Sequence, residues 1–334
     1  MKILVIGGTL FVGRLLVQSL QKAGHDVWIM HRKAEHDLGK KVGNLQADRG
    51  DAAQVKAALA GHHFDAVYDN VYDWDRGGTN ASQVEATVRA CGDQIRRYVF
   101  LSSVSAYGDG LNHHEGNALA PDDHPDTYIR NKAQTERMLF RMHQRYGIPV
   151  VTLRPPFIYG PGNPYYREAF FWDRLREGRS IIIPGDGRRL MQFIYVKDVV
   201  AACMKVLEEP SAVGHAFNIS NPRPLTQTEM VAALAEAAGT KPSMVRIPRE
   251  RILQAGGHPL SPPYYFGAVF DLPAITMVIS KAQRVLGFKP VPFAEGLKET
   301  YRWYLKNRVR ENRLDYSLED RLLQAAGVNL VATA

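Results

Sequence analysis

The sequence predicts an α/β protein in which a doubly wound parallel sheet precedes a smaller C-terminal region. Three observations support this prediction. Short apolar runs alternate with helical patterns through the first half of the chain, as parallel strands joined by crossover helices require. A glycine-rich turn directly follows the first apolar run, at residues 7–13. After Arg154 the pattern changes, because prolines and glycines become dense and irregular stretches separate the helices.

Each element follows from its local pattern. Buried parallel strands are short and continuously apolar, whereas amphipathic helices repeat apolar residues every three to four positions. Strands are expected at Ile3–Ile6, Val27–Met30, Asn44–Ala47, Ala66–Tyr68, Tyr98–Leu101 and Val150–Arg154. Helices are expected at Phe11–Gln21, Ala52–Ala60, Ser82–Ala90 and Thr127–Tyr146 in the first half, and near Ala169–Glu177, Val199–Glu208, Gln227–Ala238 and Ala294–Lys306 in the second.

Composition excludes several classes of protein. The 334 residues are 45% hydrophobic and 23% charged, which is ordinary for a globular protein. No apolar run reaches the roughly 20 residues of a membrane helix, and the short N-terminal run ends in glycines rather than in a signal-peptide cleavage site. Two cysteines are too few for a disulfide scaffold, and the adjacent histidine pairs lack ligand spacing, so no metal site is predicted. These features favour a cytoplasmic protein without membrane attachment.

The turn at residues 7–13 has the composition of a phosphate-binding loop. Glycines permit the backbone to turn sharply beside a pyrophosphate, and the N-terminus of the following helix offers unpaired N–H groups to an anion. The net charge of +8 also favours an anionic ligand. A Rossmann-type dinucleotide site is therefore predicted here, with cofactor contacts from Gly7, Thr9, Leu10, Phe11, Val12 and Gly13.

The residues after the second strand predict which nicotinamide cofactor binds. An acid there would accept hydrogen bonds from the ribose hydroxyls of NAD. The sequence instead has His31, Arg32 and Lys33, and a guanidinium at this place would pair with the 2′-phosphate of NADP. We therefore predict NADP in preference to NAD. Asp48, after the third strand, is a candidate to accept from the adenine amino group or, alternatively, to cap its own turn.

A serine, a tyrosine and a lysine form the predicted catalytic set. Tyr128 and Lys132 are four residues apart in a predicted helix, so they share one face. An ammonium lowers the pKa of a nearby phenol, which makes tyrosine a usable proton donor and acceptor near neutral pH. Ser103 follows the fifth strand at the carboxyl edge of the sheet, where ligands of such sheets bind. Its hydroxyl is a candidate to hold the reacting oxygen.

The order of these motifs resembles the extended short-chain dehydrogenases/reductases, the family that includes nucleotide-sugar epimerases and dehydratases. The matching segments run through most of the chain, at residues 7–13, 98–108, 128–132, 153–162, 185–187, 193–199, 280–282 and 286–290. The resemblance implies that Tyr128 is the acid and base, that Lys132 activates it and binds ribose, and that Ser103 binds the substrate oxygen. It also implies a two-domain fold and a homodimer.

The predicted domains divide the chain near residue 155. Residues 1–155 are expected to form the dinucleotide-binding domain and residues 156–334 mainly a substrate-binding region, with segments near 194–220 as candidates to return to the first domain. Cofactor contacts are also predicted from Tyr128 and Lys132, and from Arg49, Asn70, Val71, Ser102, Pro155 and Phe157.

Departures from the family pattern narrow the expected reaction. Family dehydratases have an Asp-Glu pair just after the serine position, where this chain has Val104 and Ser105, so sugar 4,6-dehydration is not expected. Nucleotide-sugar enzymes usually have Asn in place of Phe157 and Arg in place of Met191, and both normally face the diphosphate. Their replacement weakens the expectation of a nucleotide sugar, although the arginines at 188–189 are close enough in sequence to compensate.

The chain is also similar to the chloroplast stem-loop-binding branch of this family, whose members have RNA-related roles. The similarity covers the Gly-Gly-Thr-x-Phe loop, the Asp48-Arg49 turn, residues 217–220 and the charged tail at residues 311–323. That branch often lacks the active tyrosine, whereas Tyr128 is present here. A catalytically silent RNA-binding or regulatory protein is therefore the alternative prediction.

The favoured prediction is an NAD(P)-dependent oxidoreductase of epimerase type. It would transfer hydride at a secondary alcohol or ketone carbon of a sugar-like or nucleotide-sugar substrate, as an epimerase (an isomerase) or as a net reductase. The expected partners are this small molecule and a second copy of the chain, and nucleic acid is not favoured.

Overall fold

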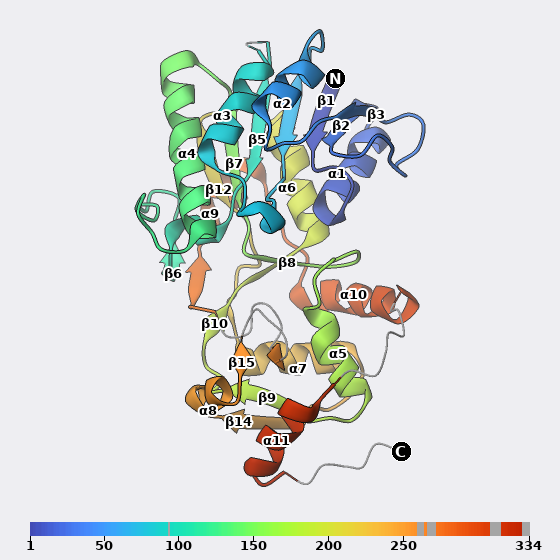
Figure 1. Cartoon of the computed structure of the whole chain (residues 1–334), viewed down its shortest axis with the longest axis vertical. Helices are drawn as coiled ribbons and strands as arrows, with labels where there is room; N and C mark the ends of the chain where they lie inside the picture. The colour runs from blue at the N-terminus through green and yellow to red at the C-terminus, as the bar shows by residue number, and fades with distance from the viewer. Residues whose placement is uncertain (93, 259–263, 266–271, 308–314, 329–334) are drawn as a thin grey trace. The chain divides into compact units, whose positions relative to one another are not determined.

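The computed structural model describes residues 1–92, 94–258, 264–265, 272–307 and 315–328 (Figure 1). The chain divides into two compact units. The first contains residues 1–158, 194–222 and 275–290. The second contains residues 159–193, 223–274 and 291–334. The first unit thus includes residues 275–290, a segment for which the sequence showed no sign of a return.

A seven-stranded sheet forms the centre of the first unit, with strand order β12-β7-β5-β4-β1-β2-β3 and parallel pairing throughout. This confirms the predicted doubly wound α/β fold. The order turns back between β1 and β4, so the loops after these two strands diverge where ligands of such sheets bind. The strands are β1 (Lys2–Ile6), β2 (Asp26–His31), β3 (Gly43–Gln46), β4 (Ala66–Asp69), β5 (Arg97–Leu101), β7 (Val150–Arg154) and β12 (His215–Asn218).

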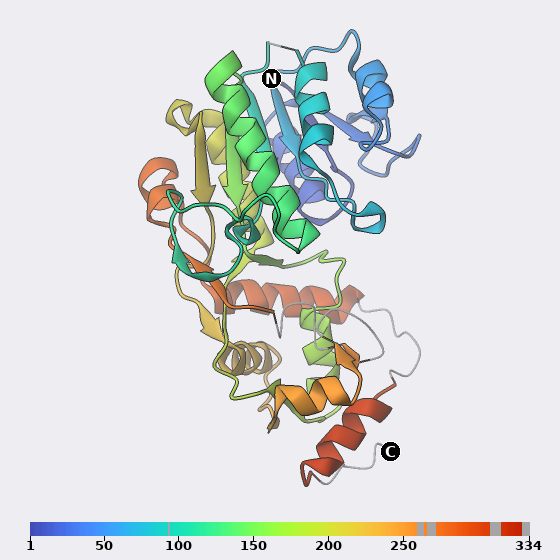
Figure 2. The ribbon, with the colours of Figure 1, turned by 60° about the vertical axis from the view of Figure 1, so that its left-hand side comes forward.

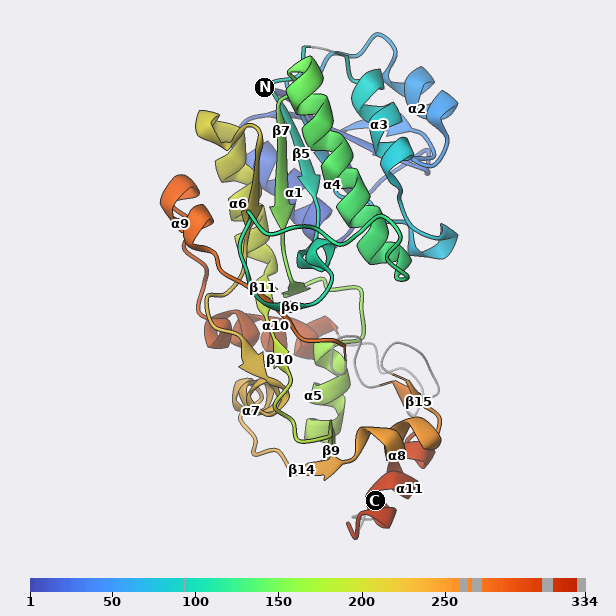
Figure 3. The same ribbon diagram turned by 90° about the vertical axis from the view of Figure 1, so that its left-hand side faces the viewer.

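Helices cover both faces of this sheet. On one face α2 (Ala52–Leu59), α3 (Ala81–Ala90) and α4 (Thr127–Tyr146) pack side by side, and on the other α1 (Phe11–Lys22) packs beside α6 (Val196–Glu208) (Figures 1 and 3). Figure 2 shows α4, in green, alongside the strands. The remaining elements of this unit are α9 (Ser280–Leu286), the short 3₁₀ turns η1 (Trp74–Arg76), η2 (Val104–Tyr107) and η3 (Pro210–Ala212), and β6 (Gly110–His113) paired in parallel with β17 (Ile275–Met277).

The position of α4 follows from its ends. Oδ1 of Asp126 accepts a hydrogen bond from the N–H of Ile129 at 3.0 Å, which begins the helix. Gly147 ends it in the left-handed conformation, with φ +72°. Tyr128 and Lys132 therefore lie in its first two turns, next to the capped end.

The core of the first unit is formed by apolar side chains of β1, β4, β5 and β7 and of the helices that cover the sheet.

The second unit is built from helices and two-stranded sheets. Its helices are α5 (Glu168–Arg176), α7 (Gln227–Ala237), α8 (Arg249–Gln254), α10 (Phe293–Asn307) and α11 (Ser317–Ala325). Its strand pairs are β9 (Ile181–Pro184) with β14 (Met244–Ile247), β10 (Leu190–Met191) with β13 (Leu225–Thr226), and β15 (Gly257–His258) with β16 (Tyr264–Tyr265). Strands β8 (Phe157–Tyr159) and β11 (Phe193–Tyr195) contain two of the points where the chain passes between units. A buried pair of Arg174 and Glu319 joins α5 to α11.

Among the residues that the structure describes, no three His, Cys, Asp or Glu side chains lie close enough together to hold a metal ion. Nor does any helix in the described ranges have the length and apolarity to cross a membrane. The first four residues of the predicted charged tail, 311–314, lie outside the described part of the chain, and α11 contains most of its remainder.

Candidate active site

The loop between β1 and α1 has glycine where any side chain would collide. A Cβ atom on Gly13 would lie 1.9 Å from the carbonyl oxygen of Gly7, so the helix packs directly on the turn. Gly7 has φ +83°, which favours glycine, and a Cβ there would lie 2.7 Å from Cγ2 of Val71. Val71, a predicted cofactor contact, thus lies against the first glycine of the loop. Together these glycines leave a backbone surface that a pyrophosphate can approach closely.

The N-terminus of α1 suits an anion. Its N-cap residue, Leu10, makes no side-chain hydrogen bond, and its first turn contains no acid. The first N–H groups of a helix have no partner within the helix, so an anion can accept from Phe11, Val12 and Gly13. Phe11 also has φ +44°, a strained conformation that is common at ligand sites. The predicted cofactor loop therefore fits a dinucleotide phosphate in both shape and charge.

Arg14, in the first turn of α1, contacts this loop and was missed by the sequence analysis. Its Nε donates to the carbonyl oxygen of Thr9 at 3.0 Å, and its Nη2 donates to Oδ1 of Asp37 at 2.6 Å. These two contacts fix the guanidinium between the predicted phosphate loop and the Asp37 carboxylate. The signal in the sequence was its place directly after Gly13, in the first turn of α1.

The predicted adenosine contacts lie at the carboxyl end of β2. His31 is the last residue of that strand, and its partial burial lowers its pKa. Arg32 and Lys33 follow it and are exposed. Nη1 of Arg32 lies 3.4 Å from Oδ2 of Asp73, in the loop after β4. Arg32 thus has a carboxylate partner that the sequence did not indicate, while its side chain stays 52% exposed.

Asp48 caps its own turn, which was one of its two predicted roles. Its Oδ1 accepts from the N–H of Gly50 at 2.9 Å, and its Oδ2 pairs with Arg76. The backbone hydrogen bond and then the guanidinium hold the pKa of this carboxyl below its usual range. Nε of Arg76 also lies 4.0 Å from Oδ2 of Asp73. Arg32, Asp73, Arg76 and Asp48 therefore form a chain of ion pairs across the loops that follow β2, β3 and β4.

Arg49, a predicted cofactor contact, points its side chain into the core. Its Nη2 pairs with Asp69, which is fully buried at the end of β4, and its Nη1 donates to the carbonyl oxygen of Gln83 at 2.6 Å. The hydroxyl of Tyr98 donates to the same Asp69 oxygen at 2.7 Å. A buried carboxylate requires such a cation, because an unpaired buried charge is costly. Any contact between Arg49 and the cofactor is thereby left to its backbone.

Asn70 has the free donor expected of a ligand contact. It follows β4, its N–H donates to the carbonyl oxygen of Ile6 at 3.1 Å, and it adjoins Val71 at the phosphate loop. Its Nδ2 is buried and has no hydrogen-bond partner among the described residues. A buried donor without a partner is unfavourable, so a ligand that accepts from it would be stabilised. We call the backbone surface around Gly7 and Gly13 the glycine cradle. This cradle and the unpaired donor of Asn70 fit the predicted dinucleotide.

Lys132 lies buried beside the ring of Tyr128. Its Nζ donates to the carbonyl oxygen of Leu101 at 2.8 Å and lies 5.8 Å from the centroid of the Tyr128 ring. It also lies 4.7 Å from the centroid of the Phe100 ring, on β5. Burial lowers the pKa of this lysine to about 8, although Asp69 and Glu136 oppose the shift. The structure therefore brings a lysine of unusually low pKa to the predicted catalytic tyrosine.

Ser103 begins the short turn η2, which packs against α4. The side chain is largely buried, and its Oγ accepts from the N–H of Ser105 at 3.1 Å. Its hydroxyl hydrogen can still be donated to another oxygen, because that contact uses the hydroxyl only as an acceptor. Pro155, another predicted contact, accepts from the N–H of Val104 in this turn at 2.9 Å. Phe157, half-buried, opens β8 two residues later.

Two aromatic residues beside Tyr128 were missed. The Trp74 ring stacks on the Tyr128 ring, with centroids 4.8 Å apart and planes at 26°. Tyr72 meets Tyr128 edge-on at 4.7 Å and Trp74 at 4.6 Å. We call Tyr72 and Trp74 the aromatic wall. The signal in the sequence was their place in the loop that follows the fourth strand, at the edge of the sheet where ligands bind.

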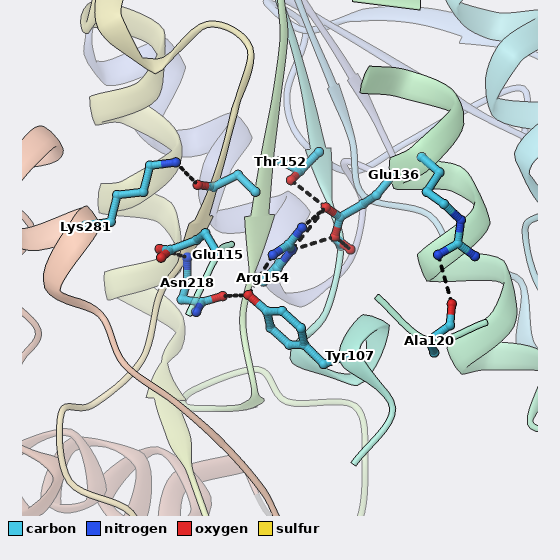
Figure 4. Close-up of polar contacts among 11 residues, drawn as sticks. Tyr107, Glu115, Ala120, Glu136, Thr152, Arg154, Asn218 and Lys281 are labelled. Atoms are coloured by element: carbon cyan, nitrogen blue, oxygen red, sulfur yellow. Dashed lines mark hydrogen bonds and ion pairs between the residues drawn. The ribbon is translucent and has the colours of Figure 1, made fainter. Parts of the chain in front are cut away.

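A buried polar network joins α4 to the sheet beside this site (Figure 4). Glu136 is fully buried and accepts from Arg154 at 2.6 Å, from Thr152 at 3.0 Å and from the hydroxyl of Ser102. Ser102, a predicted cofactor contact, therefore uses its hydroxyl to hold its loop against α4. Nη1 of Arg154 in turn donates to the hydroxyl of Tyr107 at 2.6 Å. Glu136 lies one turn after Lys132 on the same helix face, which was its signal in the sequence.

The chain is similar in sequence to known proteins. The sequence matches the NAD dependent epimerase/dehydratase family over residues 3–220. It is 30% identical to the chloroplast stem-loop binding protein of 41 kDa b of Arabidopsis thaliana, over 96% of this chain and 84% of that protein. It is 31% identical to the 2-alkyl-3-oxoalkanoate reductase of Stenotrophomonas maltophilia, over 72% of this chain and 76% of that protein.

A solved structure of similar fold is the UDP-glucose 4-epimerase of Thermotoga maritima with UDP-glucose, at a TM-score of 0.73. It is 24% identical and aligns with 92% of this chain and 99% of its own. Both predicted resemblances, to the extended short-chain family and to its stem-loop-binding branch, are thus confirmed. The chain belongs to the NAD-dependent epimerase/dehydratase family.

Proposed function

We propose that this protein transfers hydride between NADP(H) and a secondary alcohol or ketone carbon of a sugar-like substrate. The observation that supports this most is the burial of Lys132 beside the ring of Tyr128, in a sheet whose first loop is a glycine cradle. A bound nicotinamide ring would accept the hydride in one direction and return it in the other. Gly7, Gly13 and Asn70 are the residues best placed to hold the dinucleotide, together with the N-terminus of α1.

Tyr128, Lys132 and Ser103 would together transfer the hydroxyl proton of the substrate. When an alcohol is oxidised, its hydroxyl proton passes to the phenolate oxygen of Tyr128 as the hydride leaves carbon, and reduction reverses both transfers. The Lys132 ammonium stabilises the phenolate because opposite charges attract strongly in a buried site. The Ser103 hydroxyl donates a hydrogen bond to the reacting oxygen. With the Lys132 pKa near 8, the ammonium assists Tyr128 fully only below that pH.

The proposed preference for NADP depends on the end of β2. No carboxylate directly follows this strand, so the ribose hydroxyls of NAD lack their usual acceptor. Arg32 is exposed there, with Lys33 beside it, and a phosphate dianion would compete well for a guanidinium whose present partner lies 3.4 Å away. NADP therefore gains a charge-assisted contact that NAD does not.

The proposed reaction is epimerisation or net reduction rather than 4,6-dehydration. Val104 and Ser105 follow Ser103 in η2, so an acid pair for removing water is missing at that place. An epimerase keeps its cofactor bound while the hydride leaves and returns, whereas a reductase releases it after each turnover. We further propose a homodimer, which light scattering of the purified protein would test.

The experiment that tests the function is mass spectrometry of what co-purifies, followed by a turnover assay. The protein is denatured, and released nucleotides and small molecules are identified. Bound NADP with a sugar-like alcohol or ketone, consumed or interconverted by the native protein, is the expected result. A protein that neither binds a nicotinamide nucleotide nor turns over any recovered compound contradicts the proposal.

A second function, RNA binding, is favoured by one observation, the 30% identity to a protein named for stem-loop binding. The net charge of +8 is compatible with RNA binding. The retained Ser103, Tyr128 and Lys132 argue against a purely binding role. RNA affinity that falls steeply with salt, in a protein without turnover, would favour this second function over hydride transfer.

A further inference from the structure

The loop after β4 places a large exposed apolar surface at the catalytic tyrosine. The Trp74 ring stacks on the Tyr128 ring with their centroids 4.8 Å apart, yet Trp74 is 57% exposed. Exposed indoles are unfavourable in water and mark contact surfaces when they adjoin other apolar groups. Tyr72 is such a group, since its ring lies 4.6 Å from that of Trp74. The partly exposed indole therefore lies directly beside the ring of the proposed catalytic tyrosine.

Contacts with Tyr72, and with the residues on either side of Trp74, hold the aromatic wall in place. Nδ2 of Asn131 lies 3.4 Å from the hydroxyl of Tyr72. Gly78, at φ +93°, lies so close to that hydroxyl that a Cβ there would approach it to 2.2 Å. On the two sides of Trp74, Asp73 contacts Arg32 and Arg76 pairs with Asp48. These contacts make the aromatic wall preorganised for a ligand, which reduces the entropic cost of binding.

The chemistry of the wall limits what can lie on it. An indole face offers dispersion and apolar contact to flat, C–H-rich surfaces and offers no hydrogen-bond acceptor or charge. A saturated six-membered ring presents such a face, whether it is a pyranose or a hydrocarbon ring. An open chain of the same carbon number does not present a fixed face and loses more rotational freedom on binding.

We propose that Trp74 is a substrate-packing residue, whose exposed indole surface receives the flat face of the ring that bears the reacting secondary alcohol or ketone. This inference rests on the proposed function, because it names the substrate class of the same site. It makes the enzyme selective for a cyclic substrate over an open-chain one. A ring that packs on Trp74 lies next to Tyr128, the proposed acid and base, because the two side chains are in contact.

The test compares two pairs of probes that differ by the ring. UDP-glucose is compared with UDP, and cyclohexanol with 3-hexanol, each by calorimetric titration in the presence of saturating NADP⁺. The background is the Tyr128→Phe variant, so that no turnover disturbs the measurement. Trp74→Ala removes the indole from the aromatic wall, Trp74→Phe keeps a smaller ring, and Trp303→Ala is the control at an exposed tryptophan of α10.

The expected result is that Trp74→Ala weakens binding of at least one ring probe about five-fold and leaves its ring-free partner unchanged. Trp74→Phe should weaken it less, and Trp303→Ala not at all. The pair of probes whose affinity difference falls in Trp74→Ala shows whether the ring is a sugar or a hydrocarbon. Equal losses for ring and ring-free probes, or no ring probe that binds the parent better than its partner, would overturn the inference. Because only binding is measured, absent turnover in the wild type would refute the proposed function without affecting this result.

Discussion

The guanidinium of Arg32 lies 3.4 Å from the carboxylate of Asp73, so the loop after β2 contacts the loop that contains the aromatic wall. Both side chains reach solvent, and exposed pairs of this kind contribute little to stability. A 2′-phosphate has two negative charges and three acceptor oxygens, so it would replace Asp73 as the partner of Arg32. Arg32, which we propose selects the cofactor, thus lies next to the loop that contains Trp74, although more than 40 residues separate Arg32 and Trp74 in sequence.

Arg32→Ala and Asp73→Asn should change NADPH affinity in opposite directions. Loss of the guanidinium should weaken NADPH binding roughly ten-fold or more and leave NADH binding almost unchanged. Loss of the Asp73 charge should strengthen NADPH binding about two- to five-fold, because it frees Arg32 and removes a repulsive carboxylate. Titrations of both cofactors at one fixed salt concentration provide the measurement. Arg96→Ala, at another exposed pair, is the control. Equal wild-type affinity for NADH and NADPH would contradict this role for Arg32.

Tyr128→Phe should abolish turnover while cofactor affinity stays within about two-fold of the wild type. The change removes only the hydroxyl that exchanges the proton, and general acid–base groups contribute roughly 10²- to 10⁴-fold to rate. The ring that Trp74 and Tyr72 contact remains in place. Tyr146→Phe, at an exposed tyrosine of the same helix, should behave as the wild type. Turnover at the wild-type rate in Tyr128→Phe would exclude the proposed mechanism.

Lys132→Met should have a stability difference from the wild type that depends on pH. Burial lowers the Lys132 pKa from 10.5 to about 8 in the folded state, so between these values the unfolded chain binds more protons than the folded one. Wild-type stability relative to the variant should therefore rise with pH across this interval, by on the order of 2 kcal/mol between pH 7 and 9.5. Urea denaturation at both pH values measures it, with Lys56→Met on the exposed face of α2 as the control. A difference independent of pH would show that Lys132 keeps an ordinary pKa.

Glu136→Gln should destabilise the protein strongly. The change leaves the buried Arg154 without its carboxylate, and breaking a buried pair in this way costs about 3–5 kcal/mol. Adding Arg154→Met should recover part of the loss, because the unpaired charge is then gone. Glu85→Gln, at the exposed pair with Arg89, should cost less than about 0.5 kcal/mol. Chemical denaturation of the four proteins checks these values, and a loss below about 1 kcal/mol for Glu136→Gln would contradict the buried-pair account.

The sequence alone was sufficient where function depends on neighbours along the chain. The glycine loop after the first strand was predicted because a strand, a turn and a helix follow one another within 13 residues. The Tyr128 and Lys132 pair was predicted because a spacing of four puts both on one helix face. The helix at Thr127–Tyr146 has the predicted bounds, since an acid cap and a terminal glycine mark its two ends. Local geometry decides each of these features, so local pattern reveals it.

Only the tertiary structure decided the contacts between segments far apart in sequence. It turned Arg49 inward to Asp69, because a carboxylate fully buried at the end of β4 requires a cation. It put Trp74 on the Tyr128 ring, and it lowered the Lys132 pKa by surrounding the ammonium with the sheet and its aromatic neighbours. Side-chain direction and desolvation depend on which strands become adjacent, and strand order is a property of the whole sheet that no local pattern contains.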